Sequence, residues 1–187
     1  MPEIYFDNGA TTRAFPEVRE LMSEVLDIEY GNPSSMHLKG YHAEQYVNRA
    51  KEEIARSLKV EPKEIYFTSG GTEANNLALI GTAMAHKRTG KHIITSCIEH
   101  ASVYNPLGFL EEEGFEVTYL PVDEKGIVSL EALEKALRPD TFLVSIMCVN
   151  NEIGAVEPIE EIGRIVKKYN PEILFHTDCI QAYGKMK

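Results

Sequence analysis

The stretch Phe142-Leu143-Val144-Ser145-Ile146-Met147 is a nearly continuous apolar run with a preference for extended backbone. A strand that is apolar on both faces is typical of a mostly parallel sheet covered by helices on both sides. Short β-branched or aromatic runs predict the other strands of this sheet, at residues 65–67, 92–95, 116–120 and 173–176.

Between these runs, apolar residues recur at three- and four-residue spacing, the pattern of helices with one buried face. Helices are expected at residues 17–27, 43–58, 73–87, 102–113, 130–137 and 159–169. The sequence has neither an internal repeat nor a Pro/Gly/Ser-rich linker, so residues 1–187 are expected to form one continuous domain. The alternation of strands and helices predicts an α/β fold, with a mostly parallel sheet flanked by helices.

Composition narrows the class of partner. Of the 187 residues, 43% are apolar and 26% are charged, which is typical of a globular protein with a sizeable core. The net charge of -10 is spread through the helical stretches, which argues against a nucleic-acid or anionic-membrane surface. The sequence lacks a signal-peptide pattern and any run of about 18 apolar residues, so a cytoplasmic protein with a small-molecule or protein partner is expected.

The three cysteines, Cys97, Cys148 and Cys179, are an odd number without CxxC spacing. This pattern indicates neither a disulfide framework nor a zinc site, and no metal site is expected. All three are expected to be reduced, buried residues that fill space in the core.

Residues 68–76, Thr-Ser-Gly-Gly-Thr-Glu-Ala-Asn-Asn, lead from a predicted strand through a glycine turn into a helix. The free N–H groups of a first helical turn bind anions, the glycines allow close approach, and Thr72 can add a hydroxyl donor. Because the Walker lysine and the GxGxxG pattern are missing, a single phosphate is the expected guest. The alternative is a helix start capped by Ser69 or Thr72.

Polar side chains follow the other predicted strands. His100 follows one strand, Asn150 and Asn151 the next, and Asp178 and Gln181 the last. Each has a structural alternative: a lone histidine is often structural, Asn favours turns, and an Asp behind so apolar a strand is expected to be partly buried with a partner. Ligands of such sheets gather at the carboxyl ends of the strands, so these side chains are expected to share a site.

A phosphate cradle, an imidazole, two carboxamides and a carboxylate together suit pyridoxal phosphate. Its phosphate binds helix N–H groups, its ring stacks on a flat side chain, and its phenolic oxygen accepts from amides. Its ring nitrogen pairs with a carboxylate, which keeps the ring an electron sink. The residues at the strand ends therefore predict a pyridoxal-phosphate site.

The chain resembles the N-terminal half of the cysteine desulfurases. These are pyridoxal-phosphate-dependent enzymes of the class V aminotransferase-like group. Matching motifs occur in family order at residues 5–12, 31–37, 68–76, 99–100, 149–154 and 176–185. The resemblance implies the large-domain fold of fold-type I enzymes, truncated after its N-terminal part. It places residues 31–37 near a dimer interface and the mouth of the active site.

The resemblance implies cofactor-binding roles for Gly71, Thr72, His100, Asn151, Asp178 and Gln181. The first two hold the phosphate. The histidine stacks on the ring and assists proton transfer, and the aspartate pairs with the ring nitrogen, so these two are the candidate catalytic residues. The asparagine lies by the phenolic oxygen and the substrate carboxylate, and the glutamine donates to the phenolic oxygen.

Small departures from the family pattern are Gly9 and Gly71, where alanine is common, and Cys179, where a small apolar residue is usual. The family's cofactor-binding lysine, nucleophilic cysteine and small C-terminal domain have no counterpart here. Lys185 and Lys187 lie too close behind Asp178 to match that lysine and are expected to be surface charges. The chain is therefore expected to be catalytically incomplete without a C-terminal half.

A complete enzyme of this kind converts L-cysteine to L-alanine and passes the sulfur, as a persulfide, to iron–sulfur cluster or thio-cofactor assembly. The implied partners are L-cysteine, a second copy in a homodimer, a sulfur acceptor or iron–sulfur scaffold protein, and a complementary C-terminal chain. Alternatives are a selenocysteine lyase, an aminotransferase of the same class, or a non-catalytic binding module. A dinucleotide-dependent dehydrogenase is disfavoured because GxGxxG is absent.

Overall fold

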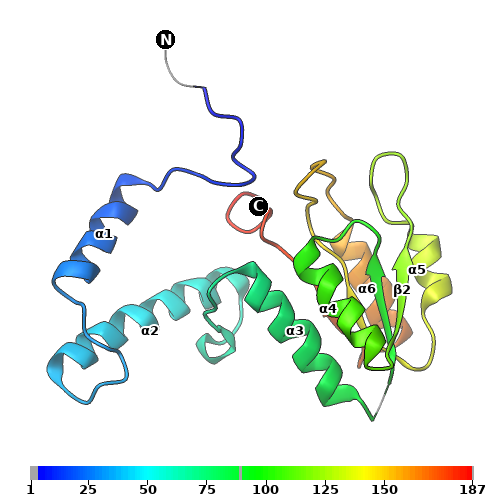
Figure 1. Ribbon diagram of the computed structural model, residues 1–187, viewed down its shortest axis with the longest axis horizontal. Helices are drawn as coiled ribbons and strands as arrows, with labels where there is room; N and C mark the ends of the chain where they lie inside the picture. The colour runs from blue at the N-terminus through cyan, green and yellow to red at the C-terminus, as the bar shows by residue number, and fades with distance from the viewer. Residues whose placement is uncertain (1–3, 89, 187) are drawn as a thin grey trace. The chain divides into compact units, whose positions relative to one another are not determined.

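The computed structural model describes residues 4–88 and 90–186 (Figure 1). The chain divides into two compact units, Met1–Phe67 and Thr68–Lys187. The assignment of residues 1–187 to one part of a large domain stays a prediction. Lys187, one of the two lysines considered above, lies outside the described residues.

The first unit is helical. Its elements are α1 Pro16–Asp27, α2 Leu38–Leu58 and the 3-10 turn η1 Pro62–Glu64. α1 begins one residue before the predicted range, with proline at its first position, where the missing N–H costs nothing. α2 begins five residues earlier than predicted, because the His37 side chain accepts a hydrogen bond from the Gly40 N–H and caps the helix there.

Residues 31–37 form a tight loop that closes onto the start of α2. The Asn32 carboxamide oxygen accepts from the Ser34 N–H at 2.9 Å, and the Asn32 carbonyl accepts from the Ser35 N–H at 2.9 Å. A Cβ on Gly40 would lie 2.1 Å from the Ser35 carbonyl oxygen, so only glycine allows this approach. The loop therefore has a structural role in its own unit, and its place near a dimer interface stays a prediction.

The second unit contains the sheet. Within the described residues, this sheet has four parallel strands in the order β2-β1-β3-β4. Their bounds are β1 His92–Ser96, β2 Glu116–Leu120, β3 Thr141–Ser145 and β4 Leu174–His176. The prediction of a mostly parallel sheet is confirmed. β1 and β3 are buried along their whole length, and the polar His92, Thr95 and Ser96 of β1 are buried with the rest.

Helices cover both faces of this sheet (Figure 1). They are α3 Gly71–His86, α4 Ala101–Glu112, α5 Leu130–Ala136 and α6 Ile159–Tyr169. Ile93 and Leu143 pack in one apolar cluster with residues of α3 and α4, whereas their strand neighbours Ile94 and Val144 pack in a second cluster with α5 and α6. Successive side chains of a strand point to opposite faces, so each face has its own core.

The prediction of a strand at residues 65–67 is wrong. The structure places these residues outside any strand. Tyr66 and Phe67 are 76% and 54% exposed. A β-branched or aromatic sequence predicts an extended backbone, but a strand also needs a neighbour, and no strand among the described residues pairs with this segment.

The order of the strands creates a switch point between β1 and β3. The chain passes from β1 to β2 on one side and then returns to β3 on the other side of β1. In such sheets, the loops that leave the two central strands separate at their carboxyl ends and open a crevice for ligands. The segments that follow Ser96, Ser145 and His176 all emerge at this edge.

Residues 4–88 and 90–186 contain neither a membrane-spanning helix nor a cluster of metal-binding side chains. No helix there is long and apolar enough to cross a membrane. No group of three or more His, Cys, Asp or Glu side chains in these residues is arranged to hold a metal ion.

Leu79→Ala on α3 is expected to lower the free energy of unfolding by about 2–5 kcal/mol, since it removes a fully buried side chain from the core between α3 and the sheet. Leu77→Ala on the same helix is the matched control, because that side chain is 59% exposed, and its effect should stay within about 0.5 kcal/mol. Urea unfolding measures both, and equal effects would contradict this packing of α3.

Candidate active site at the carboxyl edge of the sheet

Among the described residues, no side chain caps the N-terminus of α3. Gly70 is its N-cap residue and provides no side-chain hydrogen bond. The Glu73 carboxylate turns back to accept from the Ser69 N–H at 2.7 Å and the Ser69 hydroxyl at 2.6 Å, and these bonds hold the pKa of Glu73 below its ordinary value. Capping of this helix by Ser69 or Thr72 is therefore not observed. A helix start of this kind can bind a further anion through its backbone N–H groups, beside the Glu73 carboxylate that the first turn already contains.

Gly71 brings this helix start close to the segment after β4. A Cβ at Gly71 would lie 2.5 Å from the Cδ1 atom of Ile180. The alanine that is common at this position in the family would require the Ile180 side chain to move. Ile180 is 59% exposed, so it has space to do so.

His100 lies at the start of α4 as its N-cap residue. Its Nδ1 atom accepts from the Ser102 backbone N–H at 3.1 Å and lies 2.8 Å from the Ser102 hydroxyl oxygen. A backbone N–H can only donate, so Nδ1 is an acceptor and the neutral ring carries its proton on Nε2. The histidine is thus a helix cap whose ring has a fixed tautomer.

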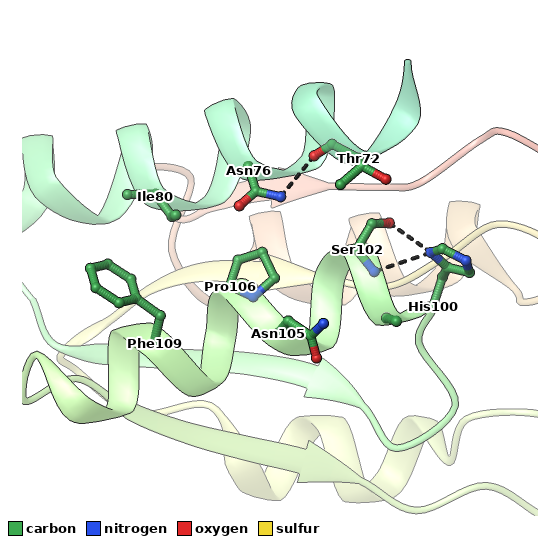
Figure 2. Close-up of a pocket in the computed structure, with 9 residues that line it drawn as sticks. Thr72, Asn76, Ile80, His100, Ser102, Asn105, Pro106 and Phe109 are labelled. Atoms are coloured by element: carbon green, nitrogen blue, oxygen red, sulfur yellow. Dashed lines mark hydrogen bonds between the residues drawn. The ribbon is translucent and has the colours of Figure 1, made fainter. Parts of the chain in front are cut away.

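A pocket of about 570 Å³ lies between α3 and α4. Figure 2 shows the α3 side chains on one side of it, the α4 side chains on the other, and His100 at the end where α4 begins. Among its lining residues are Thr72, Asn76, Ile80, His100, Ser102 and Phe109. Its volume is in the range of small-molecule sites, and it brings two of the predicted residues, Thr72 and His100, to one cavity.

Asp178 follows β4 and is 9% exposed. Its Oδ2 atom accepts from the Asn75 side chain at 2.8 Å, and its Oδ1 atom accepts from the Ile180 N–H at 2.9 Å. The prediction that this aspartate is buried and has a partner is confirmed. These two donors fix the orientation of the carboxyl group.

Glu99 connects the ends of β1 and β3. Its Oε1 atom accepts from the Ser96 hydroxyl at 2.6 Å and from the Met147 N–H at 2.9 Å, whereas its buried Oε2 atom lacks a partner among the described residues. Burial raises the pKa of the Glu99 carboxyl to about 7, and the negative charge of Asp178 adds to this increase. The carboxyl group therefore changes its charge near neutral pH.

The two neighbouring asparagines after β3 have different roles. Asn150 is buried; its Nδ2 atom donates to the Ile98 carbonyl at 2.9 Å, and its Oδ1 atom accepts from the N–H groups of Glu152 and Ile153. This is the turn chemistry proposed as the alternative. Asn151 is half-buried, and its Nδ2 atom donates to the Glu152 carboxylate at 2.8 Å. Asn151 is not among the lining residues of the pocket described between α3 and α4.

Gln181 lies in the turns that follow β4, and its Oε1 atom accepts from the Lys185 ammonium at 2.9 Å. Lys185 is exposed, in agreement with its prediction as a surface charge. Gln181 and Asp178 share one short segment, but neither belongs to the described lining of the pocket.

The cysteine prediction is correct in one respect and wrong in another. All three cysteines are free, but Cys97 is exposed, and Cys148 and Cys179 are half-buried. They lie just beyond the carboxyl ends of β1, β3 and β4, where the chain leaves the packed sheet, so they are not core residues. Burial and the neighbouring Cys179 raise the pKa of the Cys148 thiol.

Sequence reasoning missed Asn75 and Ser102. Asn75 lies on the same face of α3 as Leu79 and Ala83, the other buried residues of that helix. A buried polar residue on an otherwise apolar stripe is a sign that it has a specific partner. That sign was present in the sequence, but the identity of the partner was not, because Asp178 is 103 positions away.

Residues 4–187 match the family model described as Aminotransferase class-V. A cysteine desulfurase IscS from Dictyoglomus turgidum is 50% identical over 182 residues, which cover 97% of this chain and 46% of the relative. Among solved structures, a NifS-like protein superposes with a TM-score of 0.95 at 46% identity, over 98% of this chain and 50% of that one. The structure described as SspA in complex with cysteine has a TM-score of 0.91 at 43% identity, over 97% and 52% of the two chains.

These likenesses confirm the predicted resemblance and the fold class. The chain spans about half the length of the curated relatives that it matches. The roles assigned to the six predicted cofactor-binding residues stay predictions.

Glu99→Gln is expected to reduce the pH dependence of stability. Burial raises the pKa of Glu99 from 4.5 to about 7. Between these values the folded state binds more protons than the unfolded state, so stability falls as the pH rises through this window. This difference in the pKa of Glu99 between the two states corresponds to about 3 kcal/mol in the free energy of unfolding. Urea titrations at about pH 5 and about pH 8 measure it in both proteins.

Glu134→Gln, at an exposed position of α5, is the control for this experiment. With this substitution, the free energy of unfolding should differ between the two pH values by as much as it does in the unmodified protein. If Glu99→Gln did the same, Glu99 would not be the group responsible.

Proposed function

The chain belongs to the aminotransferase class-V family, and from this membership we propose that it is the pyridoxal-phosphate-binding portion of a cysteine desulfurase. The observation that carries the proposal is the uncapped N-terminus of α3, with Thr72 and His100 lining one pocket beside it. Free N–H groups and a hydroxyl suit a phosphate, and a flat imidazole suits an aromatic ring.

In this proposal each residue has a defined task. The N–H groups of the first turn of α3 and the Thr72 hydroxyl bind the phosphate. His100 stacks on the ring and holds its own proton on Nε2. Asp178, whose two oxygens are oriented by their donors, binds the protonated ring nitrogen. When bound, pyridoxal phosphate supplies an electron sink for negative charge at the α-carbon of an amino acid.

Asn151 and Gln181 are assigned to the polar groups around the ring. Asn151 donates to the phenolic oxygen and to the substrate carboxylate, and Gln181 donates to the phenolic oxygen. Asn151 lies on the segment after β3 and Gln181 on the segment after β4. Both carboxamides are therefore on segments that leave the carboxyl edge of the sheet, as Asp178 is. An amide can donate to an oxygen that bears partial negative charge without introducing a charge of its own.

L-cysteine is the proposed substrate of the complete enzyme. One relative is named a cysteine desulfurase, and one structural neighbour is described in complex with cysteine. The enzyme would release L-alanine and transfer the sulfur to a thiolate as a persulfide for iron–sulfur cluster assembly. The proposal includes a homodimer, a sulfur-accepting scaffold protein, a C-terminal half with the remaining catalytic groups, and a cytoplasmic location.

The test is binding of pyridoxal phosphate to the purified protein, measured by equilibrium dialysis. Thr72→Val should weaken binding about 10- to 100-fold, because a hydrogen bond to a charged group contributes about 1.5–3 kcal/mol. His100→Ala should weaken it as well, through loss of the stacking surface. Thr82→Val, further along α3, is the matched control and should bind as the unmodified protein does.

The absence of saturable binding, or equal binding by Thr72→Val and Thr82→Val, would contradict the assignment of the phosphate to the start of α3. The intact mass of each sample should be measured alongside, because a co-purifying second chain would change the interpretation of tight binding.

A further inference from the structure

Four side chains form a continuous hydrogen-bonded chain from the end of β4 to the start of α4. The Asp178 Oδ2 atom accepts from Asn75 Nδ2 at 2.8 Å, and the same Asn75 nitrogen lies 2.9 Å from Ser102 Oγ. Ser102 Oγ lies 2.8 Å from His100 Nδ1. The two inner members, Asn75 and Ser102, are only 5% and 7% exposed.

The direction of every bond in this chain follows from the donors present. His100 Nδ1 accepts from the Ser102 backbone N–H, so it has no proton and the Ser102 hydroxyl must donate to it. The Ser102 oxygen is then free to accept from one N–H of Asn75, and the second N–H of Asn75 is donated to Asp178. Both protons of one carboxamide nitrogen are therefore used, one toward each end of the chain.

The position of Asn75 indicates that this residue has specific partners. Leu79 and Ala83, the next buried residues on α3, are apolar. An apolar residue at position 75 would continue this stripe but would remove the donor to Asp178 Oδ2 and Ser102 Oγ, and a buried amide stabilises a protein only when its bonds are made. The polar residue occurs where this stripe passes the Asp178 carboxylate and the Ser102 hydroxyl.

We infer that Asn75 and Ser102 are positioning residues that couple Asp178 to His100. Asn75 fixes the direction of the Asp178 carboxylate, and Ser102 fixes the His100 ring and its Nε2–H tautomer. The inference rests on the proposed function, in which Asp178 binds the ring nitrogen of pyridoxal phosphate and His100 stacks on the ring. Through Asn75 and Ser102, a change in the hydrogen bonding of Asp178, which would pair with the ring nitrogen, alters that of His100, which would stack on the ring.

The first arm of the test uses the protein without cofactor and reads the ¹⁵N resonances of His100 by NMR. In the unmodified protein, Nε2 should show its proton and Nδ1 should resonate as a hydrogen-bonded acceptor. Ser102→Ala should move the Nδ1 resonance toward that of a weakly bonded nitrogen, and Ser102→Thr should restore it. Asn75→Leu should move it in the same direction, although residue 75 does not touch the ring.

The second arm uses the protein loaded with ¹⁵N-labelled pyridoxal phosphate and follows the resonance of the ring nitrogen with pH. Asn75→Leu should lower the pH at which this nitrogen loses its proton by about one unit, because Asp178 loses the donor that directs it. Cofactor affinity should fall about tenfold. The charge of Asp178 also raises the pKa of Glu99 and opposes the lowering of the pKa of His176 by burial, and the variants leave both side chains in place.

Leu79→Ala, one turn along α3 from Asn75, is the matched control. It weakens the same core but leaves the hydrogen-bonded chain intact, so both resonances should stay as in the unmodified protein. If Asn75→Leu left both resonances unchanged, or if Leu79→Ala changed them equally, the inference would be overturned. If the unmodified protein bound no pyridoxal phosphate, the proposed function would fail, and the cofactor-free arm would still decide whether Asn75 couples the two residues.

Discussion

The burial of β1 and β3 on both faces of the sheet is the constraint on which the rest of the second unit depends. Both strands are buried along their length between two separate apolar cores, where a charged side chain would lose its hydration. Polar and charged groups that belong to a site are therefore displaced to the segments beyond the strand ends. Glu99 and Asp178 lie there, each held by donors from neighbouring segments.

Local sequence patterns were sufficient for most of the fold. Helix periodicity located α1 and α3 to α6 to within about two residues at each end, which is the usual uncertainty of such boundaries. The errors came from interactions that a local pattern does not contain. Residues 65–67 have strand propensity without a strand partner. The start of α2 is set by the cap from His37, a residue type that is not among the preferred caps.

For the candidate site, the sequence predicted which residue types follow each strand but not how they pair. Asp178 was expected to need a partner, yet Asn75 lies on a distant helix and has no local feature that points to the end of β4. Asn150 and Asn151 are adjacent and chemically identical, and only their contacts separate a turn-forming side chain from one half-buried beside Glu152. Tertiary pairing of this kind depends on the packed arrangement of helices and strands rather than on spacing along the chain.

The hydrogen bond between Asn75 and Asp178 joins residues that are 103 positions apart, and it has a consequence for biosynthesis. At ribosomal rates of about 5–20 residues per second, α3 emerges about 5–20 s before its partner on the segment after β4. During that interval, the helix carries an unpaired amide on its apolar face. Contacts of such long sequence separation form late, because their loop-closure entropy is offset only when the intervening strands are in place. The site geometry is therefore a marker of completed folding of this unit.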